Sequence, residues 1–162
     1  MPATSLIKTL TDGADLKEES VGPLSANTFS FSFTADNFVQ FTIPMPKSWD
    51  HGEIEFRFYW FAISTLTTNV VWNIQAIAVD DDADLENIAF PTADTVVDAN
   101  AGEKLLNISE FLTFTPSGSP TNFDMVYFQI SRIPGATLDT LEAAAQIQAV
   151  KLLYTTTTSV DD

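Results

Sequence analysis

The sequence predicts an all-β protein: an antiparallel two-sheet jelly-roll sandwich of about eight strands with an extended N-terminal arm. Residues 28–33 (TFSFSF) alternate phenylalanine with polar side chains. Successive side chains of a strand point to opposite faces, so this pattern indicates a strand with one buried face. Residues 53–64 and 70–80 repeat the alternation over greater length. Turn-forming residues separate the segments, and the unequal loop lengths favour a jelly roll over an up-and-down barrel.

The alternation and its breaks predict the individual strands. The breaks are rich in Asp, Asn, Gly and Pro, which favour turns. Residues 139–146 (DTLEAAAQ) have helical propensity, enough for about two turns. The expected strands are residues 28–34, 38–43, 54–64, 70–80, 95–98, 105–115, 125–133 and 147–154.

The chain divides into an arm, a sandwich and a tail. Residues 1–26 are mostly small, polar or charged and sustain no period, so we expect an extended arm that lies outside the core. Residues 27–155 form the sandwich, and residues 156–162 form a C-terminal tail without a core pattern. The apolar side chains of the arm are its expected anchors on a partner: Leu6, Ile7, Leu10 and Leu16.

Composition limits the classes of partner. The chain has 162 residues, enough for one domain with a sizeable core, and a net charge of −15. Its 7 basic residues are scattered, whereas a nucleic-acid surface needs clustered Lys and Arg, so we expect no nucleic-acid partner. We also expect no membrane partner, because the opening residues lack a signal-peptide pattern and no apolar run reaches the roughly 18 residues of a membrane helix.

Candidate catalytic and metal-binding residues are few. The single histidine, His51, follows Ser48 and Asp50 in one turn, where their side chains diverge instead of converging as a catalytic triad requires. We therefore expect neither an enzyme nor a cofactor. The acidic run at 80–86 departs from the helix-loop-helix calcium motif. We expect it to be a solvated loop and assign no metal site, with a looser calcium-binding loop as an alternative.

The two longest expected strands carry apolar side chains on both faces. One face of each belongs to the core, and the other is more apolar than a lone sandwich needs. We therefore expect a homo-oligomer whose interface includes these outward residues: Tyr59, Phe61, Ile63, Val71 and Ile77.

Two further features have expected roles. Trp49 lies in an expected loop and is a candidate exposed platform for a ligand, whereas the periodicity places Trp60 and Trp72 in the core. Arg132 ends an apolar strand and precedes Asp139, and an arginine in that position typically forms an ion pair that holds a loop. We expect a structural Arg132–Asp139 pair.

Several segments taken in order resemble a known module. They are Phe41-Thr-Ile-Pro-Met-Pro, Trp49-Asp-His-Gly before FRFYWF, Val71-Trp72, and the closing FQISRI, Asp139-Thr140 and Ala149-Val-Lys-Leu-Leu-Tyr154. Over residues 38–154 the chain resembles jelly-roll virion structural proteins of tailed bacteriophages, of the capsid decoration (cement), head-fibre or tail-appendage type. The pattern is structural and transfers no functional residue.

The resemblance implies a non-enzymatic protein of the virion, assembled in the host cytoplasm. The expected role is a capsid cement protein that forms a homotrimer, binds the major capsid protein or another virion protein, and reinforces the shell through its arm. The alternative is a tail or head-fibre module that binds a receptor or glycan. That alternative requires an exposed aromatic cluster, expected at Trp49 or in the loop at 116–122.

Overall fold

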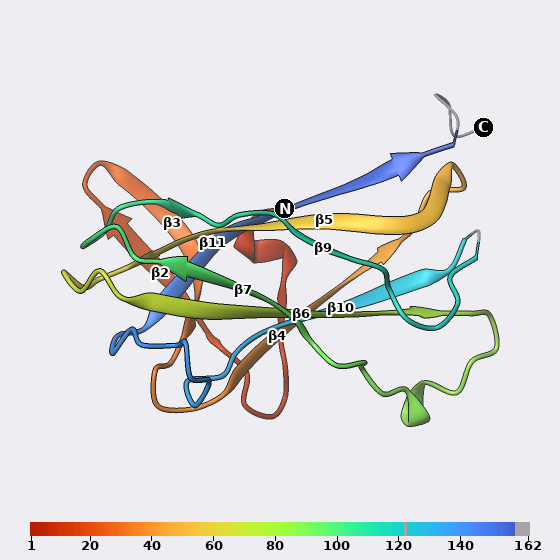
Figure 1. Ribbon diagram of the computed structural model, residues 1–162, viewed down its shortest axis with the longest axis horizontal. Helices are drawn as coiled ribbons and strands as arrows, with labels where there is room; N and C mark the ends of the chain where they lie inside the picture. The colour runs from red at the N-terminus through yellow and green to blue at the C-terminus, as the bar shows by residue number, and fades with distance from the viewer. Residues whose placement is uncertain (122, 158–162) are drawn as a thin grey trace.

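The computed structural model describes residues 1–121 and 123–157, which form two antiparallel β-sheets packed face to face (Figure 1). One sheet has five strands in the order β1 (Ile7–Lys8), β4 (Asn37–Pro44), β10 (Met125–Arg132), β6 (Asn69–Val79) and β7 (Asp94–Ala99). The other has the order β2 (Asp15–Val21), β3 (Leu24–Phe31), β11 (Ala145–Thr156), β5 (Trp49–Ala62) and β8 (Asn107–Ile108), and β9 (Leu112–Phe114) also pairs with β5.

This strand order confirms the predicted sandwich. Strands β3, β11, β5 and β8 with β9 face strands β4, β10, β6 and β7, which is the pairing of a jelly roll. Two short 3-10 turns complete the described secondary structure: η1 (Ala3–Ser5) and η2 (Leu85–Asn87). Neither helix approaches the length and apolarity that crossing a membrane would require.

The core lies between the sheets and is rich in aromatic side chains. Alternation along β5 and β6 directs every second residue inward, as the sequence predicts. Phe41 of β4 stacks on Phe128 of β10 with ring centroids 4.6 Å apart. Across the two layers, Trp72 of β6 stacks on Phe58 of β5 at 5.4 Å and meets Phe31 of β3 edge-on at 5.2 Å.

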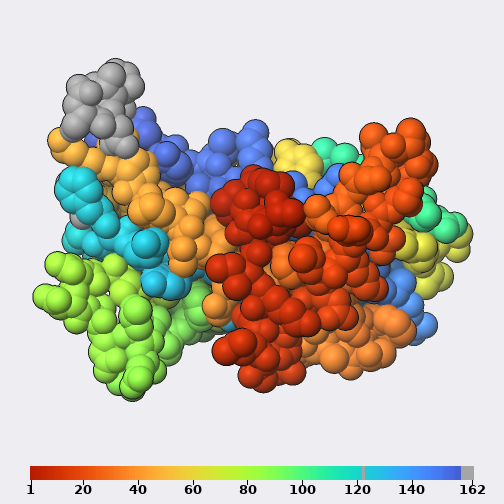
Figure 2. All heavy atoms as spheres, turned by 180° about the vertical axis from the view of Figure 1, so that it is seen from behind, coloured from red at the N-terminus to blue at the C-terminus, as the bar shows by residue number. Residues whose placement is uncertain are grey.

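The N-terminal residues belong to the sandwich, which corrects the expected arm at residues 1–26. β2 pairs with β3 along its whole length, and β1 pairs with β4 at the edge of the opposite sheet. Before β1, the backbone of Met1 exchanges hydrogen bonds with Val150 of β11. Ala3 and Leu6 are 1% and 5% exposed and join the core. Figure 2 shows this segment, in red, crossing one side of the molecule between the two layers.

Several element boundaries differ from the prediction: β3 begins at Leu24 and ends at Phe31, and β11 extends from Ala145 to Thr156. β5 begins at Trp49, earlier than expected. The expected strand at 105–115 is split into β8 and β9, because the hydroxyl of Ser109 between them accepts the hydrogen bond of the Phe58 backbone N–H. Residues 139–144 form no helix, because the carbonyl groups of Leu141 and Ala143 accept hydrogen bonds from the buried guanidinium of Arg132. Of the predicted tail at 156–162, residues 158–162 lie outside the described part of the chain.

Candidate functional site

Three glutamines form a row across the outer face of the five-stranded sheet. The strand register aligns Gln40 of β4, Gln129 of β10 and Gln75 of β6 side by side. Gln40 Nε2 donates to Gln129 Oε1 at 2.7 Å, and Gln129 Nε2 donates to Gln75 Oε1 at 2.8 Å. Gln75 Nε2 in turn donates to the carbonyl of Pro91, in the loop between β6 and β7. The amides are therefore held in a directional chain that ends at that loop.

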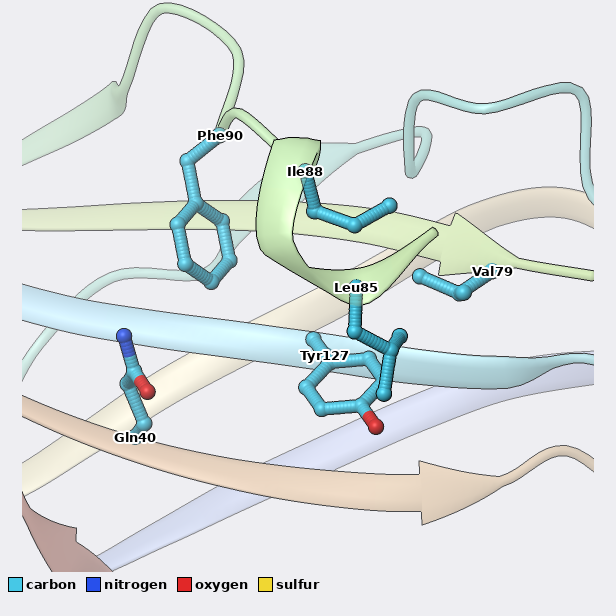
Figure 3. Close-up of a pocket in the computed structure, with 6 residues that line it drawn as sticks. All are labelled: Gln40, Val79, Leu85, Ile88, Phe90 and Tyr127. Atoms are coloured by element: carbon cyan, nitrogen blue, oxygen red, sulfur yellow. The ribbon is translucent and has the colours of Figure 1, made fainter. Parts of the chain in front are cut away.

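A groove lies beside this row, where the loop folds over the sheet (Figure 3). Val79, Tyr127 and Gln40 line it from β6, β10 and β4. Figure 3 shows the loop side of the groove, where Leu85, Ile88 and Phe90 stand opposite the strands. The cavity volume is about 220 Å³. Typical sites for drug-sized ligands span about 300–1,000 Å³, so the groove suits a smaller group.

The lining of the groove is uncharged and presents free hydrogen-bonding groups. All six lining side chains are neutral, although the chain carries a net charge of −15. Among the described residues, no side chain or backbone group hydrogen-bonds to Gln40 Oε1 or to the Tyr127 hydroxyl. The Tyr127 and Phe90 side chains are half-buried, so their rings remain partly accessible. The groove thus offers aromatic surface, an amide acceptor and a phenol to a neutral ligand.

Trp49 is not the exposed platform that the sequence predicts. Its side chain is 1% exposed and belongs to the core cluster, because residue 49 is the first of β5 instead of part of a loop. The described part of the 116–122 loop provides no aromatic side chain, and the backbone of Ser117 hydrogen-bonds to Ala76 and Ala78 of β6. Asn122 lies outside the described residues. The expected aromatic cluster is absent from both predicted positions in the described structure.

The expected interface residues do not form one surface. Tyr59 and Phe61 point outward from β5 on the six-stranded sheet, and Ile63 directly follows that strand. Val71 and Ile77 point outward from β6 on the other sheet. Phe61 and Val71 are 3% and 5% exposed, so the chain itself covers them. Ile63 is 44% exposed. The two groups lie on opposite faces of the sandwich and cannot contact one partner copy through a single patch.

Of the expected anchors, Leu6 is buried in the core, whereas Ile7, Leu10 and Leu16 are 65%, 107% and 57% exposed. Arg132 and Asp139 form the ion pair expected from the sequence, with Nη2 and Oδ1 2.7 Å apart and both side chains buried.

The acidic loop at 80–86 has a structural role at its end. The side chain of Asp84 caps η2, accepting hydrogen bonds from the backbone N–H of Glu86 and from Asn87 Nδ2. Within the described residues, no group of three or more His, Asp or Glu side chains is placed to hold a metal ion. This loop supports η2 and thereby the apolar wall of the groove.

Sequence reasoning missed the glutamine row and the groove. The available signal was an isolated glutamine at an outward position in each of three apolar strands, within VQF, IQA and FQI. Their alignment depends on the register of strands far apart in sequence, which a single sequence does not reveal. The apolar residues of the 85–90 loop gave no periodic signal.

Comparisons with known proteins find similarity of structure only. No protein-family model matches the sequence, and no curated protein matches it. Similar solved structures include a non-crystalline cellulose-specific carbohydrate-binding module, CBM28 (TM-score 0.49, 11% identity, covering 93% of this chain and 89% of that one). TmCBM61 in complex with β-1,4-galactotriose has a TM-score of 0.48 and 7% identity, and the match covers 95% of this chain and 91% of that one. A putative sugar-binding protein from Bacteroides thetaiotaomicron has a TM-score of 0.47 and 12% identity, covering 93% and 86%. At these TM-scores the likenesses assign neither a family nor a ligand to this chain.

Proposed function

We propose that this protein is a non-catalytic binding module that takes a neutral sugar in the groove over the five-stranded sheet. The observation that carries the proposal is the glutamine row, whose first member, Gln40, lines an uncharged groove together with Tyr127 and an aromatic and aliphatic wall. A small binding site of this kind combines apolar contact area with a few oriented polar groups.

The chemistry of the groove matches the chemistry of an uncharged sugar. A sugar ring presents C–H groups that pack on aromatic rings and hydroxyl groups that both donate and accept hydrogen bonds. Gln40 Oε1 can accept from such a hydroxyl, and the Tyr127 hydroxyl can donate to or accept from one. Since the lining carries no charge, a sulfated or carboxylated sugar would lose hydration without gaining an ion pair. The volume of about 220 Å³ suits one sugar unit or the end of a chain.

The test is binding of the full chain to a panel of neutral and anionic glycans, followed by calorimetry with the best neutral ligand. Tyr127→Phe removes only the hydroxyl and should weaken binding by about 3- to 10-fold, the usual effect of one lost hydrogen bond. Phe90→Ala should weaken binding by about 10-fold, because it removes one aromatic wall.

A matched control uses another aromatic residue of the same region. Phe123 is 72% exposed and does not line the groove, so Phe123→Ala should bind as the parent protein does. The proposal fails if no neutral glycan binds, or if Phe123→Ala weakens binding as much as Phe90→Ala.

The role on a virion is a separate prediction, which rests on the resemblance. Residues 1–26 are not a free arm, because β1 and β2 pair within the sandwich. A cement mechanism would therefore have to use the exposed side chains of this segment, Ile7, Leu10 and Leu16, without the reach of an extended arm. A head-fibre or tail-appendage protein can itself be a binding module, so the groove and a virion location are compatible. Mixing the protein with shells that lack it and counting the bound copies per pelleted shell tests this location.

A further inference from the structure

The outer face of β5 carries an ordered charge pattern far from the groove. Glu53, Glu55 and Arg57 point outward at every second position, while Ile54 and Phe56 between them are fully buried. This face belongs to the six-stranded sheet, the upper layer in Figure 1. β5 thus displays two negative charges followed by a positive one on its solvent side.

The positive end of this strip has no salt-bridge partner among the described residues. The register places Lys151 of β11 directly opposite Arg57, and like charges directly opposite each other destabilise a sheet. Among the described residues, neither side chain forms a salt bridge, although the chain has 22 acidic residues and 7 basic ones. Two adjacent cations of this acidic protein are therefore without a salt bridge in the described part of the chain.

Arg57 is also held in position. Its guanidinium carbon lies 3.7 Å from the centroid of the Phe111 ring, and its Nε is buried without a hydrogen-bond partner. The stack leaves the guanidinium with unused donors and a reduced freedom of movement. Leu153, opposite Glu55, and Phe111 are 39% and 38% exposed, so apolar surface accompanies the charges.

We propose that this strip is an interface between two copies of the chain related by a two-fold axis. With the two β5 strands antiparallel and face to face, Glu55 of each copy lies over Arg57 of the other. The same operation brings Leu153 of each copy over the aliphatic stem of Lys151 of the other. An isologous contact requires a self-complementary patch, and a strip that runs from acid to base meets that requirement. The charge pattern favours two copies, whereas the resemblance implies three.

The test is sedimentation velocity of the full chain, with two charge-reversal variants measured alone and mixed. The experiment should be run near physiological salt, since the net charge of −15 drives copies apart when it is unscreened. We expect a concentration-dependent dimer for the parent protein. Arg57→Glu and Glu55→Arg should each raise the dimer Kd by about 100-fold or more, because each places like charges across the interface. An equimolar mixture of the two variants should dimerise again, since each copy then carries the charges that its partner lacks.

The control and the contradicting outcomes are specific to this face. Glu18→Arg makes the same charge change as Glu55→Arg at an exposed position of β2, on the far side of β3 and β11, and should dimerise as the parent does. The proposal is overturned if the parent is monomeric at several hundred micromolar, if it assembles as three or more copies, or if the mixed variants remain monomeric. Glycan binding does not enter these outcomes, because the groove lies on the opposite sheet.

Discussion

Arg132 binds both carboxylate oxygens of Asp139, with Nε to Oδ2 at 3.0 Å and Nη2 to Oδ1 at 2.7 Å. The guanidinium is fully buried and also donates to the carbonyl groups of Leu141 and Ala143. Asp139 in turn accepts from the backbone N–H of Val71. One arginine therefore ties the connection between β10 and β11 to the start of β6.

Asp139→Ala should lower the free energy of unfolding by about 3–5 kcal/mol, because the change leaves a buried guanidinium without its counter-charge. Urea denaturation at neutral pH measures the loss. The control is Asp15→Ala in the exposed Lys8–Asp15 pair, where a change of no more than about 1 kcal/mol is expected. Equal losses for the two variants would contradict the structural role assigned to Arg132.

Two substitutions in the N-terminal segment test whether this segment belongs to the core or is a free arm: Leu6→Ala and Leu10→Ala. Leu6 is 5% exposed within the core cluster, whereas Leu10, four residues later, is fully exposed. Leu6→Ala should reduce the stability to unfolding by about 2–5 kcal/mol, and Leu10→Ala should have little effect. Thermal or urea unfolding of both variants checks this. Two equally small effects would favour an arm outside the core.

Trp49→Ala should destabilise the sandwich by about 3–5 kcal/mol, because it removes a large side chain from the core. Under conditions where the variant is still folded, its Kd for a neutral glycan should match that of the parent, since Trp49 does not line the groove. A stable variant that has lost ligand binding would restore Trp49 as a platform.

Gln129→Ala should weaken glycan binding although Gln129 does not line the groove. It removes the acceptor that positions the Gln40 amide, so we expect a loss of about 3- to 10-fold. Gln148, on the opposite sheet, offers the control Gln148→Ala. If the Kd measured by calorimetry is unchanged in Gln129→Ala, the hydrogen bond from Gln40 to Gln129 is not needed to position the Gln40 amide for binding.

The exposed Lys8–Asp15 pair predicts a small dependence of stability on pH. The hydrogen bond from Lys8, and then its charge, lower the pKa of the Asp15 carboxyl below its ordinary value. A lowered folded-state pKa stabilises the fold above the unfolded pKa, and this contribution is lost as the pH falls through the folded value. An NMR titration should show the Asp15 pKa rising toward normal in Lys8→Met. If the Asp15 pKa is the same in Lys8→Met as in the parent protein, the two side chains do not form this pair in solution.

Strong alternation made the central strands predictable, as along β5 and β6, where inward residues form the core. The N-terminal region was not predictable for the opposite reason. β2 (DLKEESV) is a polar edge strand with no buried residue, so its sequence has no alternation to detect, and only its pairing with β3 identifies it as a strand. Pattern reasoning therefore mistook a paired edge for an arm.

The candidate site was less accessible to sequence reasoning than the fold. Arg132 and Asp139 are seven residues apart, and both the apolar strand and the acidic residue after it are visible in the sequence. The glutamine row joins Gln40 to Gln129, which are 89 residues apart, through a register that depends on the completed sheet. Local signals identify local contacts, whereas the groove arises from distant strands.

The pairing of β3 with β11 also determines the order in which the chain can fold during synthesis. Residues 29–31 of β3 pair with residues 145–147, so this edge of β3 has no strand partner until residues 145–147 have left the ribosome. Contacts of such long sequence separation make folding slow. The β2–β3 hairpin closes through the short turn at Gly22-Pro23 and can form at once. The polar β2 strand then covers one edge of β3 early, which limits its pairing with other nascent chains.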